Sequence, residues 1–534
     1  MSYLFEQQVG KHKYVYLIHG FRDKNGKVKQ KRISVGKVDP NTGKQIFKPE
    51  CYELLREAGI DAIPAEEMKT FSISDVKKSS VRSYGLFRLL KCIADDVRLS
   101  TVLKNTIPEY WEEILTLAMY MVSTRDPLMY CQDWLEKTDS YNVSDMSSQR
   151  ISEILSSISL ENRNAFYKEW HKKFINKNDY LALDITSVSS YSGLNESVEH
   201  GYNRDKEDLP QINLCMLMAE KTNLPLFQTT YSGSIGDIST LNNTIKEFDS
   251  IVGTRQITII TDKGFGSIPN ISMLLDAGNN GKNPVKFLSA MPIISNLIKG
   301  LIDDERNTID SIKNTIVVNG DSMRAVTRII PWEGKTIGVH AHIYYNPSAA
   351  LARREKVFSD VMSLYEEAKK DPAKYVDKED YSKYINFIWK SKNVYELEIN
   401  ELAVEEAIKY SGWLVLLSNK FFDAESALQA YRDKDVVEKG FQRLKNNIDF
   451  SRLRVHGGKL MEAKLFIGFI ATILMCEINK VMKKNGLYKK YTMYEMLKVV
   501  EKQHLQEING QKIVSPTTAE QKAIYECFGI NIIY

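Results

Sequence analysis

The chain lacks the features that mark secreted and membrane-spanning proteins. Its six cysteines are scattered, with no CxxC pair, so the sequence indicates neither a disulfide framework nor a cysteine zinc site. The first residues carry no secretory signal, and the longest apolar run, residues 465–476, is too short to cross a bilayer. We therefore expect a cytoplasmic protein with no membrane partner, in which residues 465–476 form a buried core helix.

A strong excess of one charge is also missing. The 72 basic and 68 acidic residues give a net charge of +4, which alone does not argue for nucleic acid. The basic residues are unevenly placed, however, because the segment from Lys11 to Arg32 is rich in Lys and Arg and holds one acid, Asp23. Alternating runs flank Asn25-Gly26, which predicts a tight hairpin turn. The segment is either a surface for a phosphate backbone or a solvated hairpin face.

Hydrophobic periodicity predicts a multidomain α/β protein. Helical spacing dominates one early region, in which Ser147 or Ser148 is a candidate N-cap, and short apolar runs alternate with helical patterns farther on. We expect six segments in chain order: a basic β element with an N-terminal hairpin (1–65), a helical region (66–178), the first part of a mixed-sheet core (179–292), an inserted β-rich domain (293–411), the second part of the core (412–480) and a helical C-terminal region (481–534).

Two aspartates are candidates for one shared site. Asp184 and Asp262 each follow a strongly apolar run, so we predict that each ends a strand. The carboxyl ends of strands in an open α/β sheet face the crevice where ligands bind. A turn or a helix cap explains either aspartate alone.

A polar stripe on one predicted helix supplies a third carboxylate. Tyr431, Lys434, Glu438 and Lys445 are spaced so that they fall within about 60° of one another on a single continuous helix. This stripe borders the apolar face of the same helix. The alternative is an ordinary Lys-Glu pair on a surface helix.

Three converging carboxylates have a specific chemical use. Asp184, Asp262 and Glu438 would repel one another, and divalent cations bound through oxygen would relieve that repulsion. Two such ions about 4 Å apart activate an attacking hydroxyl and stabilise the leaving oxygen of a phosphodiester. Mg²⁺ is the expected ion, with Mn²⁺ as a substitute, because no Cys or His cluster favours a softer metal.

The order of motifs resembles that of the DDE transposases of bacterial insertion sequences, in the group with a Tyr-x2-Arg-x3-Glu-x6-Lys motif. The likeness covers nearly the whole chain, including the long insertion before the glutamate. It is carried by LALDITSVSSYSG, GYNRDKEDLPQINLCML, ITIITDKGFGSIPNI, YRDKDVVEKGFQRLK and RVHGGKLMEAKLFIGFIATIL.

The resemblance implies a fold, an activity and partners. The fold would be an RNase-H-like core interrupted by the β-rich insertion, and the activity would be Mg²⁺-dependent cleavage and strand transfer of double-stranded DNA. The segments 1–65 and 66–178 would bind DNA at the terminal inverted repeats. A homodimer on paired ends, acting on target DNA in the nucleoid, is also implied.

The resemblance assigns roles to individual residues. The three carboxylates would be the catalytic metal ligands, Tyr431 and Lys434 would contact phosphate, and Lys445 would contact the terminal DNA. Where the family has Arg, this chain has Lys434, which cannot form the planar bidentate phosphate contact.

Two other readings stay open at this stage. One is an RNase-H-like nuclease without strand transfer, and the other is a transposase-derived DNA-binding protein without catalysis. Among the remaining candidates, Trp332 and Trp413 either stack on a flipped base or pack in the core, with core packing favoured. His340 and His342 alternate on a predicted strand without metal-ligand spacing, which favours a structural role.

Overall fold

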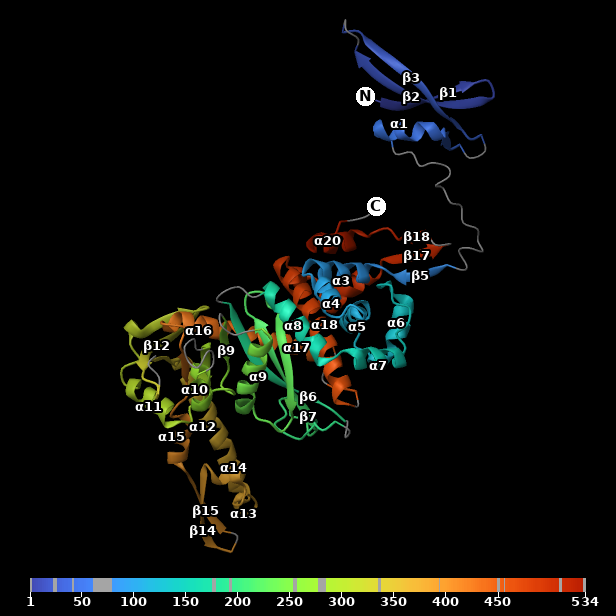
Figure 1. Cartoon of the computed structure of the whole chain (residues 1–534). Helices are drawn as coiled ribbons and strands as arrows, with labels where there is room; N and C mark the ends of the chain where they lie inside the picture. The colour runs from blue at the N-terminus through green and yellow to red at the C-terminus, as the bar shows by residue number, and fades with distance from the viewer. Residues whose placement is uncertain are drawn as a thin grey trace. The chain divides into compact units, whose positions relative to one another are not determined.

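The computed structural model describes residues 2–22, 26–40, 43–60, 79–174, 179–191, 195–252, 257–276, 285–334, 338–392, 394–448, 452–455, 457–508 and 511–531. The chain divides into two compact units (Figure 1). Unit 1 comprises Met1–Val81 and Gln506–Ile513, and unit 2 comprises Arg82–Leu505 and Val514–Tyr534.

Unit 1 contains a four-stranded antiparallel sheet packed on a short helix. The sheet follows chain order, with β1 (Ser2–Val9), β2 (His12–Arg22), β3 (Val28–Val38) and β4 (Gln45–Phe47), and is followed by η1 (Pro49–Cys51) and α1 (Tyr52–Glu57). Val15, Leu17 and Val35 on the sheet pack with Cys51 and Leu55. Alternation of apolar and polar residues along β2 and β3 gives the sheet this one buried face.

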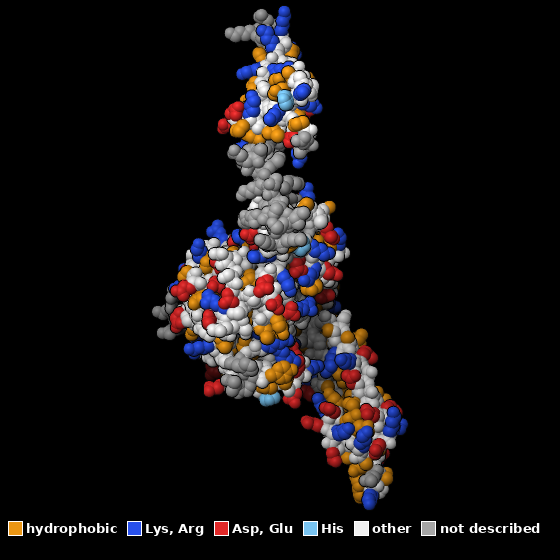
Figure 2. Space-filling view, turned by 90° about the vertical axis from the view of Figure 1, so that its right-hand side faces the viewer, with side chains coloured by type: hydrophobic (Ala, Val, Ile, Leu, Met, Phe, Trp, Pro, Cys, Tyr) orange, Lys and Arg blue, Asp and Glu red, His pale blue; other side chains and the backbone are white. Residues whose placement is uncertain are grey.

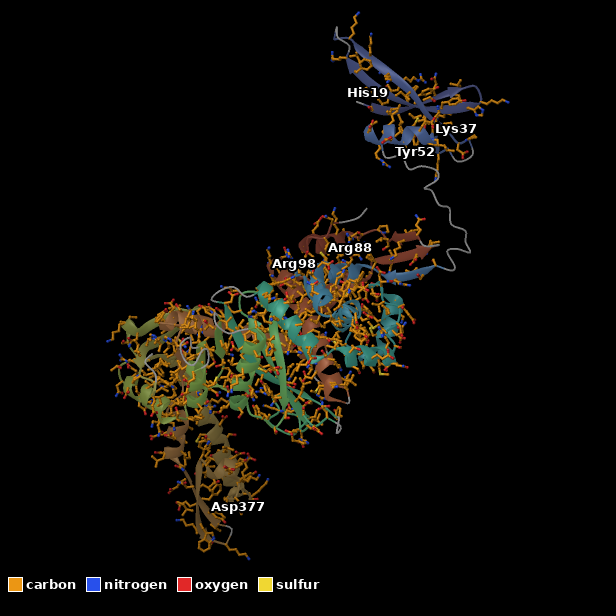
Figure 3. All side chains as sticks on the ribbon, in the orientation of Figure 1. His19, Lys37, Tyr52, Arg88, Arg98 and Asp377 are labelled. Atoms are coloured by element: carbon orange, nitrogen blue, oxygen red, sulfur yellow. The ribbon has the colours of Figure 1, made fainter. Side chains whose placement is uncertain are left out.

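The predicted hairpin of β2 and β3 is confirmed by their antiparallel pairing. Gly26 has a φ of +76°, which suits glycine in a tight turn, whereas Asn25 lies outside the described residues. The outer strands β1 and β4 were not predicted from the sequence. In Figure 3, His19 and Lys37 mark the sheet, and Tyr52 marks α1.

A helical layer opens unit 2, as the sequence predicts. Amphipathic spacing builds its helices around a common apolar core that includes Leu89, Leu117 and Ile154. Ser147 is the N-cap of α7, since its side chain accepts a hydrogen bond from the backbone N–H of Arg150. The layer comprises α3 (Gly85–Asp96), α4 (Leu99–Thr106), α5 (Trp111–Ser123), η2 (Leu128–Tyr130), α6 (Cys131–Lys137), α7 (Ser148–Ser157) and α8 (Leu160–Phe174); Figure 3 labels Arg88 on α3 and Arg98 just before α4.

A nine-stranded mixed sheet forms the centre of unit 2 and confirms the expected mixed α/β architecture. β9 is parallel to β6 and to β10, and the remaining neighbours are antiparallel. In sheet order the strands are β11 (Thr315–Val318), β12 (Asp321–Ile330), β13 (Val339–Tyr345), β16 (Trp413–Ser418), β10 (Lys286–Met291), β9 (Thr258–Thr261), β6 (Tyr180–Ser189), β7 (Gln211–Ala219) and β8 (Pro225–Ser232).

The segment 293–411 differs from the expected separate domain. Its strands β11, β12 and β13 extend the central sheet, because β13 pairs with β16 of the second core segment. The rest is mainly helical, and only β14 and β15 form a sheet of their own. The other elements of this segment are α11 (Asn296–Glu305), η3 (Ile312–Asn314), α12 (Pro347–Lys370), α13 (Pro372–Tyr375), α14 (Glu379–Ser382), β14 (Ile385–Ser391), β15 (Val394–Ile399) and α15 (Glu401–Ile408).

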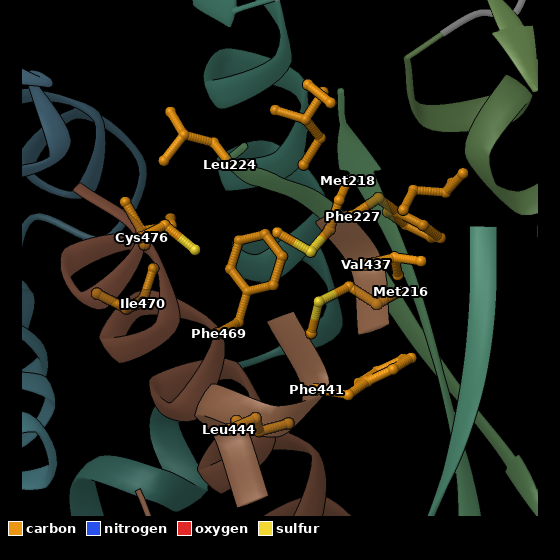
Figure 4. Close-up of a cluster of buried hydrophobic side chains, with 14 of the residues drawn as sticks. Met216, Met218, Leu224, Phe227, Val437, Phe441, Leu444, Phe469, Ile470 and Cys476 are labelled. Carbon is orange, nitrogen blue, oxygen red and sulfur yellow. The ribbon is translucent and has the colours of Figure 1, made fainter. Parts of the chain in front are cut away.

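Helices cover the sheet. α17 packs against β6 and β7, α18 against β8 and α17, and α10 against β10. The side chains of Val437, Phe441 and Leu444 form the buried face of α17, and Figure 4 shows them beside Met216 of β7 and Phe469 of α18. The helices on the sheet are α9 (Asp237–Ile251), α10 (Ile268–Asp276), α16 (Ala424–Asp433), α17 (Asp435–Ile448) and α18 (Gly458–Lys484).

Gly440 permits the close approach of α17 to the sheet. A Cβ at this position would lie 2.3 Å from the sulfur of Met218, which is closer than side-chain atoms pack. The small residue therefore sets how near α17 lies to β7.

The helix α18 is the central buried helix of unit 2. Among the described residues it is the one helix long and apolar enough to cross a membrane by length and composition, and 83% of its most apolar window is buried inside the protein. Residues 465–476 are all buried, which confirms the predicted core helix.

The C-terminal segment is partly helical. It contains η4 (Leu487–Lys489), α19 (Met493–Glu501) and α20 (Ala519–Cys527), and both α19 and α20 begin with a capping box. It also contains β17 (His504–Ile508) and β18 (Gln511–Val514), which form a three-stranded sheet with β5 (Ser80–Ser83). The purely helical prediction for residues 481–534 missed these strands.

Candidate active site

Asp184 and Asp262 lie side by side on two parallel strands. β6 and β9 pair with Leu183 opposite Thr261, so the two aspartates take the next position in each chain. Neighbouring strands are about 5 Å apart, which places the two residues next to each other. Asp262 directly follows β9, as the sequence predicts, and both aspartates are partly buried.

The prediction that Asp184 ends its strand is wrong. β6 continues beyond Asp184 to Ser189, because residues 185–189 pair with the buried strand β7. Asp184 therefore lies inside the strand, where its Oδ1 accepts a hydrogen bond from the backbone N–H of Ile185 at 2.8 Å.

The side chain of Asp184 lies on the face of the sheet that α17 covers. Asp184 is directly opposite Met216 of β7, and opposite side chains of an antiparallel pair point to the same face. The sulfur of Met216 lies 3.9 Å from the position that a Cβ would take at Gly440 of α17. α17 therefore packs over the face that carries Asp184.

The turn after β9 holds the Asp262 carboxylate and brings another carboxylate beside it. The backbone N–H of Gly264 donates to Oδ1 of Asp262 at 2.8 Å. A Cβ at Gly264 would lie 3.1 Å from that oxygen and 2.9 Å from Oδ2 of Asp237. Glycine is therefore required by the close approach of two carboxylates, and Asp237 at the start of α9 borders the site.

Burial and repulsion perturb Asp184. Burial raises the pKa of Asp184 to about 6, the negative charge of Asp262 adds to this rise, and the hydrogen bond from Ile185 opposes it. Lys434 and Arg204 also oppose the rise, as smaller effects. The charges of these two cations thus reach Asp184.

Tyr431 faces the same two aspartates. Burial raises the pKa of its phenol, and the charges of Asp262 and Asp184 raise it further. The Lys434 ammonium lies 5.4 Å from the centre of the Tyr431 ring, within cation–π range. The structure therefore gathers Tyr431 and Lys434 around the aspartate pair.

The prediction of one continuous helix carrying the polar stripe is wrong. α16 ends at Asp433, α17 begins at Asp435, and a turn at Lys434 separates them. Just before this break, the side chain of Arg432 donates a hydrogen bond to the backbone carbonyl of Val318 at 2.6 Å. Tyr431 therefore belongs to a different helix from Glu438 and Lys445, and Lys434 lies in the turn between the two helices.

Glu438 stands apart from the aspartate pair. Its side chain is exposed on α17 and accepts a hydrogen bond from Gln442 at 3.3 Å. Within the described ranges, no group of three or more His, Cys, Asp or Glu side chains is close enough to hold a metal ion. The structure thus brings together two of the three predicted carboxylates.

Lys445 forms an ion pair within the protein. Its Nζ donates to Oδ2 of Asp205 at 2.5 Å, and its side chain is only 12% exposed. The predicted contact of Lys445 with terminal DNA would require this pair to open. Lys445 and Glu438 lie on the same flank of α17, about 20° apart around the helix axis.

Sequence reasoning missed the ion pair of Arg204 and Asp237. Arg204 donates to both carboxylate oxygens of Asp237 at 2.5 Å. The available signals were an acidic residue at a helix start after Gly236 and a charged loop before β7. Neither signal reveals a pairing between residues so distant in sequence.

Trp332, Trp413 and His342 are buried in the protein. Trp332 is buried and donates to the Ser272 hydroxyl at 2.9 Å, and Trp413 is buried with its ring centre 4.9 Å from that of Tyr345. Core packing is therefore the reading that the structure supports for both. His342 is fully buried within the sheet, and burial lowers its pKa to about 4.

A comparison with protein families decides the assignment. The family model described as "Transposase DDE domain" matches residues 176–474, which is more than half of the chain. The chain belongs to the DDE transposase family. The matched segment begins just before β6 and ends within α18, so it contains the aspartate pair and Glu438.

A solved structure of the piggyBac transposase, in a synaptic complex with hairpin DNA, also resembles this DDE transposase. The two chains are 11% identical, with a TM-score of 0.37, over 78% of this chain and 76% of the other. None of the curated proteins matches the chain. The family assignment rests on the match over residues 176–474.

The aspartate pair of this DDE transposase fits a divalent cation. Asp184 and Asp262 offer hard oxygen ligands, and their repulsion is the kind that a bound cation relieves. The Asp237 carboxylate lies nearby but is already paired with Arg204. The residues therefore fit a metal ion bound by Asp184 and Asp262. In this structure no third carboxylate among the described residues lies in position to bind the same ion.

Proposed function

We propose that the chain is the transposase of a bacterial insertion sequence, which binds the ends of its element and catalyses metal-dependent phosphodiester hydrolysis and DNA strand transfer. The observation that carries this proposal is the pairing of Asp184 with Asp262 on parallel strands inside the segment that matches the transposase domain. Mg²⁺ is the expected ion, and Mn²⁺ would substitute for it.

The chemistry follows from the charges of the site. Two divalent cations bound there would supply the chemistry, one activating the attacking hydroxyl and the other stabilising the leaving oxygen of a phosphodiester. Asp184 must lose its proton to act as a ligand, and because its pKa is raised to about 6, protons compete with the cation for this carboxylate below about pH 6. Lys434 would hold a DNA phosphate near the pair, while Tyr431 would orient that phosphate through its hydroxyl.

We include Glu438 as the third ligand. The helix that carries it packs directly on β6 and β7, the strand of Asp184 and its neighbour. Within the described ranges, its carboxylate accepts a single hydrogen bond, a long one of 3.3 Å from Gln442 at an exposed position, so turning toward the site would cost little. This arrangement supports a site that is completed when metal and DNA bind.

The sheet supports an RNase-H-like core. The meander β6, β7 and β8 is antiparallel, and β9 and β10 continue from β6 as parallel strands. Three antiparallel strands followed by two parallel ones are the arrangement of an RNase-H-like sheet. The strands β11 to β13 and β16 would then be this chain's extension of that core.

Double-stranded DNA is the proposed partner, as terminal repeats and as target. The basic residues of β2 and β3 are exposed, and Figure 2 shows Lys and Arg side chains over this part of the chain. Such a surface can hold a phosphate backbone. A homodimer on paired ends and a location in the cytoplasm at the nucleoid complete the proposal.

The test is an incubation of the purified protein with Mg²⁺ and DNA that carries the sequences flanking its gene. Cleavage at the element ends followed by joining to target DNA is the expected result. Cleavage without joining would indicate a nuclease, and binding without cleavage would indicate a DNA-binding protein. Either outcome would overturn the proposed strand transfer.

A further inference from the structure

A large basic groove lies in unit 2, outside the aspartate site. It encloses about 990 Å³ and is walled by the end of α5, one side of α17, the last turns of α18, η4 and the start of α19. All five elements belong to the same compact unit.

Positive charge dominates the lining of the groove. Glu495 is its one carboxylate among the described residues, and it is occupied in capping α19, where its Oε2 accepts from the backbone N–H of Thr492 at 2.7 Å. The lining cations are Arg125, Lys439, Arg443, Lys483, Lys489 and Lys490. Such an excess of cations over one occupied acid favours an anionic ligand.

Several of these cations are available to a ligand. The side chains of Lys439, Lys483 and Lys489 are exposed, and none of the three forms an ion pair in the part of the chain that the structure describes. Lys490 is paired with Glu520 at 3.1 Å. Separate, exposed lysines along one groove match the regular spacing of charge on a phosphate backbone better than a single small anion.

Aromatic side chains accompany the charges. Tyr488 and Tyr494 line the groove and are 41% and 49% exposed. Tyrosine presents an apolar ring and a hydroxyl that donates to phosphate oxygen, and both occur where proteins contact DNA backbone. The groove therefore offers nucleic acid aromatic side chains as well as positive charge.

The groove is connected to the active-site region through α17. Gln442 lines the groove and also donates to Oε1 of Glu438 at 3.3 Å. Lys439 and Arg443 project from the opposite flank of α17 to that of Lys445. Gln442 therefore links the groove to the residue proposed as the third metal ligand, although the cations that α17 contributes to the groove lie on its other flank.

An adjoining cavity limits the basic surface. It encloses about 600 Å³ and shares Lys439, Arg443 and Lys483 with the groove, but it adds four carboxylates: Glu220, Asp321, Asp433 and Asp435. These acids would repel a phosphate backbone. The anion-binding surface is therefore confined to the larger groove.

We propose that this groove binds the phosphate backbone of the duplex DNA that flanks the cleaved phosphodiester. The proposal rests on the proposed function for the identity of the polyanion, and it gives the C-terminal helices α18 and α19 a part in holding DNA. Contacts of this kind position the DNA without reading its sequence.

The test compares two pairs of lysine substitutions in the full chain. Lys483→Gln with Lys489→Gln removes two charges from the groove, and Lys356→Gln with Lys370→Gln removes two exposed charges from α12. Binding to a fluorescein-labelled duplex of mixed sequence is measured by anisotropy over a range of salt concentrations. Melting temperatures of all the proteins verify folding.

The groove pair should weaken binding and reduce the slope of log K against log salt by about 2, one for each lost phosphate contact. The α12 pair should keep the wild-type slope. Acetylation of lysines, read by mass spectrometry, should show Lys483 and Lys489 protected by DNA and Lys356 and Lys370 unprotected.

Three outcomes would overturn the proposal. A wild-type slope in the groove pair, or an equal loss in both pairs, would show that the groove does not hold DNA. Tighter binding of RNA than of DNA, lost in the groove pair, would make the ligand RNA. In each case cleavage of the end-containing DNA by the wild type would leave the proposed function standing, whereas its absence would count against that function alone.

Discussion

Asp184 and Asp262 occupy neighbouring positions on the parallel strands β6 and β9, one residue beyond the pair formed by Leu183 and Thr261. This strand register brings together two carboxylates that are far apart in the sequence. Their repulsion and the burial of Asp184 leave the site with a demand for positive charge, which Lys434 and Arg204 meet only in part.

The variant Asp184→Asn should gain stability relative to the wild type as the pH rises. The folded-state pKa of Asp184 is raised to about 6, so between about pH 4 and pH 6 the folded wild type binds more protons than the unfolded chain. Its free energy of unfolding therefore falls through this window, by up to about 3 kcal/mol, and Asn has no such loss. Melting temperatures in metal-free buffer at about pH 4 and about pH 7 measure the difference. A difference that does not change with pH would contradict the burial and repulsion described for Asp184.

Gly264→Ala should damage the site without damaging the fold. The added Cβ would lie 2.9 Å from Oδ2 of Asp237 and 3.1 Å from Oδ1 of Asp262, so at least one carboxylate must move. Displacement of this size should lower DNA cleavage by roughly 10- to 100-fold. Gly300→Ala is the matched control, because nothing lies within 4 Å of its Cβ position in α11. Equal cleavage by the two variants would show that the geometry at Gly264 is unimportant.

Substitutions of Lys445 and of Asp205 should change the affinity for DNA in opposite directions. If Lys445 leaves Asp205 to contact DNA, Lys445→Gln removes a phosphate contact and lowers the salt slope by about 1. Asp205→Asn removes the competing carboxylate and should raise the affinity. The affinities of both variants for end-containing DNA decide the matter. A fall in affinity for both would mean that the ion pair itself, and not the free lysine, supports DNA binding.

The sequence correctly predicts the structural features that depend on short stretches of the chain. The hairpin of β2 and β3, the N-cap at Ser147, the buried helix around residues 465–476 and the end of β9 at Asp262 all follow from turn chemistry, capping and hydrophobic periodicity. These features depend on residues that are close together in the chain. The prediction holds because no distant partner is needed to decide them.

Contacts between residues far apart in the sequence explain where the sequence-based predictions were wrong. β6 runs past Asp184 because β7 offers a pairing partner, although residues 185–190 look polar enough for a loop. α16 and α17 separate at Lys434 although the helical periodicity continues, and Arg432 binds the carbonyl of Val318 in the sheet extension. The strands of segment 293–411 join the central sheet through β16 for the same reason. Pairings of this kind leave no local signal in the sequence.

The site was partly predictable. The two aspartates were found from apolar strand patterns, whereas Asp237 and Arg204 were missed because only the fold brings them to Gly264 and Asp262. The role of Glu438 stays a prediction, since its carboxylate lies beside Gln442 in this structure.

The most direct test of the central claim is a measurement of Mn²⁺ binding by electron paramagnetic resonance in the wild type and in three variants, Asp184→Asn, Asp262→Asn and Glu438→Gln. If the two aspartates hold the cation, each Asn variant should bind Mn²⁺ at least about 10-fold more weakly, equivalent to about 1.4 kcal/mol. Glu438→Gln should weaken Mn²⁺ binding mainly when DNA is present, because we propose that its carboxylate joins the site when DNA binds. Wild-type Mn²⁺ affinity in either Asn variant would contradict the account.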